Sequence, residues 1–144
     1  MSSLINKVLF TRAGFGLTAI RIVVGIIFAA HGAQKLFGMF GGYGIAGTAQ
    51  YMESVGLAPG HLMAILAGGT EFFGGLALII GLLTRPAALG LSILSLVAIF
   101  SVHIHNGLFM ANNGYEFALA LLGGSIAVLI EGAGKLSLDG AITD

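Results

Sequence analysis

The feature of this sequence that most restricts its fold is a carboxylate, Glu71, inside an otherwise apolar run. The run begins near Ile65 and continues to Leu83. A helix that crosses a membrane needs about 20 consecutive, mostly apolar residues. An acidic side chain at the bilayer centre costs roughly 2.5–3.5 kcal/mol on insertion scales. We therefore expect Glu71 to face polar groups from other segments of the chain and not the lipid.

The composition indicates a membrane protein. The chain has 144 residues, of which 57% are hydrophobic and only 8% are charged, whereas soluble domains average about 25% charged residues. The formal net charge is zero, which argues against nucleic acid as a partner. The sequence contains no cysteine, so disulfides, thiol catalysis and cysteine-ligated iron–sulfur clusters are excluded within this chain.

Four apolar segments predict membrane-spanning helices. They cover about residues 14–37, 61–83, 86–105 and 115–132. Residues 1–13 and 38–60 are more polar, and we expect them to hold short interfacial helices. The 24 glycines suit close helix packing in lipid, where small residues let backbones approach each other. We predict an all-α fold: a single domain over residues 1–144 that forms an integral membrane four-helix bundle.

The basic residues indicate the orientation. With four spans, both termini lie on one side of the membrane, together with Lys7, Arg12, Arg85 and Lys135. The opposite side has only Lys35 at its edge. The positive-inside rule then predicts that both termini are cytoplasmic.

On this topology, the polar residues of the spans gather in the outer half of the membrane. They are His31, Lys35, His61, His103, His105 and Glu116. A helix rises 1.5 Å per residue, which places Glu71 roughly 15 Å below the outer boundary and Arg21 roughly 5–10 Å deeper. We predict that His31, Lys35, Glu71 and Glu116 line one pocket. His103 or His105 should complete its rim, since two residues apart they cannot both face one pocket on a continuous helix. We also predict that Arg21 reaches upward to pair with Glu71 and that Phe28, Phe72 and Phe73 form an apolar slot.

Each of these residues also has a simpler interpretation. Arg21 and Glu71 could form a structural ion pair that sets the register of two helices. His31 could be a hydrogen-bonded core residue, Lys35 a snorkelling boundary residue, and Glu116 a side chain favoured by a helix dipole. The histidines and carboxylates are also metal-ligand types. Their spacing matches no strong ligand motif, so we predict no metal site, with metal and haem kept as open alternatives.

Several short motifs of the chain, taken in order, are similar to those of one family. They are Arg21 with Phe28-Ala29-Ala30-His31-Gly32-Ala33-Gln34-Lys35-Leu36, then Tyr51-Met52-Glu53-Ser54-Val55-Gly56-Leu57, Glu71 with Gly74-Gly75, Gly81-Leu82-Leu83-Thr84-Arg85-Pro86, Gly107 with Glu116, and Gly132-Ala133-Gly134-Lys135-Leu136-Ser137-Leu138-Asp139. The chain resembles a DoxX-family membrane protein. The resemblance implies a four-helix protein of the bacterial inner membrane. It also implies redox-associated functions, among them a thiosulfate:quinone oxidoreductase subunit and partners of oxidative-stress enzymes.

Two functional hypotheses follow. The leading one is a redox-associated membrane protein linked to quinone or quinol, acting as an oxidoreductase or as an accessory to one. Its proton-transfer residues would be His31, Glu71 and Glu116. Its ligand-binding residues would be Arg21, Lys35, Phe28, Phe72, His103 and His105. The alternative is a non-catalytic protein that binds or transports a small amphiphile, or that acts as a membrane scaffold or assembly factor for a partner enzyme. Both hypotheses allow a homo-oligomer or a redox partner protein in the lipid membrane, and both leave open whether the chain is itself an enzyme.

Overall fold

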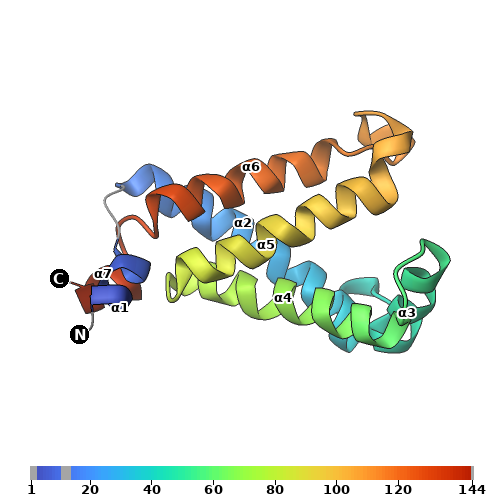
Figure 1. Cartoon of the computed structure of the whole chain (residues 1–144), viewed down its shortest axis with the longest axis horizontal. Helices are drawn as coiled ribbons and strands as arrows, with labels where there is room; N and C mark the ends of the chain where they lie inside the picture. The colour runs from blue at the N-terminus through green and yellow to red at the C-terminus, as the bar shows by residue number, and fades with distance from the viewer. Residues whose placement is uncertain (1–2, 11–13, 144) are drawn as a thin grey trace.

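The computed structural model describes residues 3–10 and 14–143, and within these residues the chain is all-helical (Figure 1). Seven α-helices follow one another in these ranges: α1 (Ser3–Leu9), α2 (Phe15–Phe37), α3 (Gly44–Ser54), α4 (Gly60–Ile80), α5 (Thr84–Ala98), α6 (Glu116–Glu131) and α7 (Leu138–Thr143). Short turns connect them: η1 (Met39–Gly41), a π-helical turn η2 (Ile99–His103), η3 (Ile104–Asn106) and η4 (Met110–Asn112). The predicted all-α class is confirmed for the described residues.

The helices α2, α4, α5 and α6 pack against one another in the body of the molecule (Figure 1). α2 packs against α4 and α6, and α5 packs against the same two helices. In the part of the chain that the structure describes, three helical stretches are long and apolar enough to cross a membrane: Phe15–Phe37, Gly60–Ile80 and Thr84–Asn106. α6 has 16 residues, which corresponds to roughly 24 Å. The described part of the first predicted interfacial segment is α1, and the second segment contains η1 and α3; residues 1–2 and 11–13, with Arg12, lie outside the described residues.

Glycines bring α2 and α4 into backbone contact. A Cβ on Gly25 of α2 would lie 2.7 Å from the carbonyl oxygen of Gly75 on α4. A Cβ on Gly32 would overlap the backbone of Phe72, and one on Gly75 would overlap the backbone of Ala29. Small residues are expected at such contacts because packing, and not burial from water, holds helices together in lipid. The close approach sets the register of α2 on α4, and this register brings the end of α2 level with the middle of α4.

Arg21 joins α2 to the end of α4 and to the chain after α6. Its side chain is fully buried. Its Nε donates to the carbonyl of Ala133, Nη1 donates to those of Leu78 and Ile79, and Nη2 donates to those of Lys135 and Leu136, at 2.7–3.2 Å. A guanidinium has five N–H donors, and each has a carbonyl acceptor here.

The predicted pairing of Arg21 with Glu71 is therefore wrong. The last carbonyls of a helix have no partner within it and carry a partial negative charge. Such carbonyls at the end of α4, together with those of the chain after α6, accept from Arg21, so its side chain points away from Glu71.

Asp139, near the start of α7, completes this end of the molecule. It is 1% exposed, and its carboxylate accepts hydrogen bonds from the backbone N–H groups of Leu83 and Thr84 at 2.8 and 2.9 Å. These N–H groups stand at the start of α5, where a negative charge is favoured by the helix dipole. The segment after α6 is thus an integral part of the fold, tied to α2, α4 and α5.

Candidate functional site

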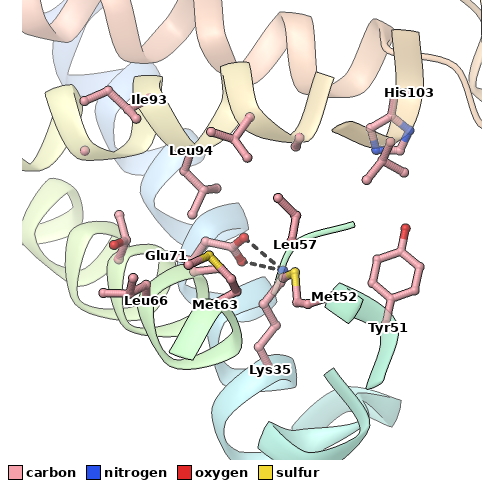
Figure 2. A pocket seen from close by; sticks show the side chains of 16 residues that line it. Lys35, Tyr51, Met52, Leu57, Met63, Leu66, Glu71, Ile93, Leu94 and His103 are labelled. Atoms are coloured by element: carbon pink, nitrogen blue, oxygen red, sulfur yellow. Dashed lines mark hydrogen bonds and ion pairs between the residues drawn. The ribbon is translucent and has the colours of Figure 1, made fainter. Parts of the chain in front are cut away.

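A partly buried ion pair links the last turns of α2 to the middle of α4. Lys35 lies in the last turns of α2, and its Nζ is 2.9 Å from both carboxylate oxygens of Glu71 (Figure 2). The Glu71 side chain is 7% exposed and that of Lys35 is 25% exposed. Removing a carboxylate from water is costly unless a cation compensates it. Lys35, and not Arg21, supplies that compensation.

The ion pair lies in the wall of a pocket with a volume of about 510 Å³. The pocket is bounded by α2, α3, α4, α5 and η2, and its lining is mainly apolar. Its larger apolar side chains include Met52, Leu57, Met63, Leu66, Ile93 and Val97. Beside the ion pair, the polar lining residues are Tyr51, Thr70 and His103 (Figure 2). The arrangement suits a molecule with an apolar body and a few polar atoms.

A change of helix geometry brings His103 to this pocket. The α-helical part of α5 ends at Ala98, and a π-helical turn runs from Ile99 to His103. His103 lines the pocket, whereas His105, in the following turn, is exposed and is not part of the lining. Two residues correspond to about 200° on an ideal α-helix, so the spacing alone predicted that only one of the two could face a pocket on a continuous helix.

His31 and Glu116 do not reach the pocket, so the prediction of one cavity shared by His31, Lys35, Glu71 and Glu116 is wrong. The His31 ring contacts that of Phe117 on α6, with 5.9 Å between ring centroids. Glu116 accepts a hydrogen bond of 2.9 Å from the backbone N–H of Met110. Four residues on a helix correspond to about 400°, so His31 and Lys35 differ in direction by about 40°. The long Lys35 side chain reaches α4, while the short imidazole remains between α2 and α6.

The phenylalanines do not form the predicted slot either. Phe28 is 3% exposed and belongs to the core cluster that also contains Leu78 and Leu91. Phe72 stacks edge-on against Phe37 and Phe73, with centroid distances of 5.3 and 5.2 Å. Aliphatic and methionine side chains line the pocket in their place.

The sequence interpretation missed the contribution of α3. Its Tyr51 and Met52 line the pocket, and α3 packs against both α2 and α4. Tyr51 and Met52 belong to the second of the family motifs quoted above, and this motif was the feature of the sequence that could have indicated their role in the pocket. Within residues 3–10 and 14–143, the structure shows no cluster of three or more histidine, aspartate or glutamate side chains able to hold a metal ion.

Comparison with known proteins places the chain in a family. The family profile named DoxX matches residues 16–104, a range that contains Lys35, Glu71 and His103. The inner membrane protein YqjF of Escherichia coli (strain K12) is 35% identical over 130 residues, which cover 86% of this chain and 89% of that protein. The "Putative oxidoreductase CatD" of Bacillus subtilis (strain 168) is 32% identical over 124 residues, with 86% and 84% covered.

An uncharacterized protein of Haemophilus influenzae is 40% identical over 83 residues, and this match spans 58% of the chain and only 55% of the relative's length. No solved structure matches the chain significantly. The family profile covers more than half of the chain, and the match to YqjF extends over most of both proteins. On these grounds, the chain belongs to the DoxX family.

Proposed function

We propose that this chain is a redox-associated membrane protein that binds a quinone or quinol in the pocket around Lys35 and Glu71. The observation that carries the proposal is the ion pair itself, which lies in the wall of an otherwise apolar pocket. Ionisable residues within a membrane are by default candidates for function. The volume of about 510 Å³ lies within the range of ligand sites, roughly 300–1,000 Å³.

The polar groups suit a ring that carries oxygens. An ammonium group has three N–H donors, and Lys35 directs its bonds to the two oxygens of Glu71. A remaining donor direction can bind a ring carbonyl, and the Glu71 carboxylate can accept a proton from a ring hydroxyl. The aliphatic walls suit the ring and its hydrocarbon tail.

The redox association is supported by a relative and by elementary chemistry. Interconversion of quinone and quinol transfers two electrons and two protons per ring. Lys35 and Glu71 are able to exchange protons with a bound ring. The chain has no cysteine, and we assign the electron transfer to a partner protein. One relative carries a name that includes "oxidoreductase".

We further propose that α6 is a fourth span and that both termini face the cytoplasm of a bacterial inner membrane. Both termini lie at the same end of the molecule, with α1 and α7 (Figure 1). Lys7 is part of α1, Arg85 binds the carbonyl of Phe10 just after α1, and Lys135 precedes α7. α6 packs beside α2 and α5, and a short span is accommodated by local thinning of the bilayer. YqjF is named as an inner membrane protein. Reporter fusions at Asp144 should be active only in the cytoplasm.

The binding proposal is tested by extraction. Protein purified in mild detergent is extracted with organic solvent, and quinones are quantified by mass spectrometry per mole of protein. We expect bound quinone in the unmodified chain and at least a severalfold loss in Lys35→Met and in Glu71→Gln. Glu131→Gln, at the far end of α6, is the matched control and should retain it. Absence of quinone, together with no binding of added quinone, would refute the proposal.

The second candidate is a non-catalytic protein that binds or transports another small amphiphile. The dominance of apolar side chains in the pocket lining favours it. It predicts that the same extract contains a different lipophilic molecule, lost in the same two variants. An empty extract with stable oligomers would favour the scaffold or assembly role.

A further inference from the structure

The hydrogen bond made by His103 determines which of its ring nitrogens is free. Nδ1 lies 2.9 Å from the backbone carbonyl oxygen of Asn113. A carbonyl oxygen can only accept a hydrogen bond, so Nδ1 carries the hydrogen in this contact. In the neutral imidazole the other nitrogen, Nε2, then has no hydrogen and is an acceptor.

The carbonyl that orients the ring is itself held in place. Asn106 Nδ2 donates to the same oxygen at 3.1 Å. Asn113 has a φ of 57°, a left-handed conformation that asparagine tolerates better than most residues. Because Nδ1 is bonded to the Asn113 carbonyl, Nε2 is the ring nitrogen that remains to bind a molecule in the pocket that His103 lines (Figure 2).

The pocket therefore offers two different partners to a ligand. Lys35 is a donor beside the Glu71 carboxylate, and His103 Nε2 is an acceptor. The remaining polar side chains, Tyr51 and Thr70, carry hydroxyl groups that can rotate to donate or to accept. These two hydroxyls fit a ring oxygen with or without a hydrogen, so they do not discriminate between the two.

We propose that the pocket binds the reduced, hydroxyl-bearing form of a quinone-type ring more tightly than the oxidised form, with His103 as the specificity-determining residue. This inference rests on the quinone-type ligand proposed above. A ring hydroxyl donates to Nε2. A quinone carbonyl in the same place would set one lone pair against another and leave both acceptors without a donor. Burying acceptors without a donor disfavours the oxidised form.

The test measures the affinity of one ring in both oxidation states. The probes are a benzoquinone with a decyl tail and its chemically reduced quinol, titrated anaerobically into the detergent-solubilised full chain. The net value of one hydrogen bond corresponds to roughly a twofold to twelvefold change in affinity. We expect the quinol to bind about fivefold more tightly. In His103→Ala the ratio should fall towards one, because the quinol loses a hydrogen bond and the quinone loses an unfavourable contact between two acceptors. His61→Ala, which removes an exposed histidine at the start of α4, should keep the preference.

A spectroscopic measurement separates specificity from a structural role. The histidine rings are labelled with ¹⁵N, and the signals of His103 are identified as those that are absent from the spectrum of His103→Ala. In the unmodified chain, the His103 Nε2 signal should be that of a nitrogen without a hydrogen. This signal should shift when quinol is added but not when quinone is added. Equal affinities for quinol and quinone in the unmodified chain would overturn the inference and leave quinone binding standing. Loss of both ligands in His103→Ala would also overturn it, because that result indicates a structural role. Failure of both probes to bind the unmodified chain would instead refute the proposed function.

Discussion

Removing one partner of the Lys35–Glu71 pair should have unequal effects, depending on which partner is removed. Breaking a fully buried ion pair by removing one side costs roughly 3–5 kcal/mol, since an uncompensated charge is left behind. The Glu71 side chain is 7% exposed, so Lys35→Met leaves a carboxylate with little access to water, and we expect a loss of about 3 kcal/mol in unfolding free energy. The Lys35 side chain is 25% exposed. After Glu71→Gln its ammonium can turn towards the open side of the pocket, and we expect a loss of about 1 kcal/mol.

The double variant provides the internal check. Lys35→Met combined with Glu71→Gln removes both charges, so the cost should be about 2 kcal/mol less than the sum of the single changes. Denaturant-induced unfolding in detergent, followed by far-ultraviolet circular dichroism, gives all four corners of the cycle. If Glu71→Gln costs as much as Lys35→Met, the reasoning from exposure is refuted. If the double change equals the sum to within about 0.5 kcal/mol, the two residues are not coupled.

Four further substitutions, one of them a control, test the packing. Arg21→Lys keeps the charge but has at most three donors for five carbonyls, so it should lower the unfolding free energy by about 2 kcal/mol or more, measured in the same unfolding assay. Gly75→Ala should separate α2 from α4 and lower the yield of folded protein in gel filtration, while Gly69→Ala, with nothing within 4 Å of the added Cβ, should be neutral or mildly stabilising. Asp139→Ala should cost about 1–3 kcal/mol by freeing the buried N–H groups at the start of α5, and hydrogen exchange of the Leu83 and Thr84 amides should speed up; unchanged exchange would contradict that role.

Much of the helical architecture was predictable because its causes are local. An apolar run of about 20 residues specifies a membrane-compatible helix whatever surrounds it. Helices lie over all four apolar segments, and α2 and α4 meet at glycines. The expectation that Glu71 needs a polar partner came from the cost of its burial, which depends on chemistry and not on the fold.

The identity of that partner depended on the tertiary structure. Either the Glu71 carboxylate or backbone carbonyls could have accepted hydrogen bonds from Arg21. In the structure Arg21 binds backbone carbonyls of residues that lie 57 to 115 positions away along the chain. The hydrophobic periodicity of a segment does not indicate where the last carbonyls of a distant helix lie in space. Because Arg21 binds these carbonyls, the ion pair of Glu71 is formed with Lys35.

The direction of each polar side chain was decided in the same way. Helical spacing places His31 and Lys35 on one side, but a difference of about 40° and the unequal lengths of the side chains send them to different helices. A π-helical turn selects His103 over His105, and such a turn depends on the packing of the segments around it. The sequence by itself determined which residues are costly to bury, because that cost belongs to each side chain. Only the tertiary structure decided which of them meet, because helix register and rotation are set by contacts between segments far apart in the chain.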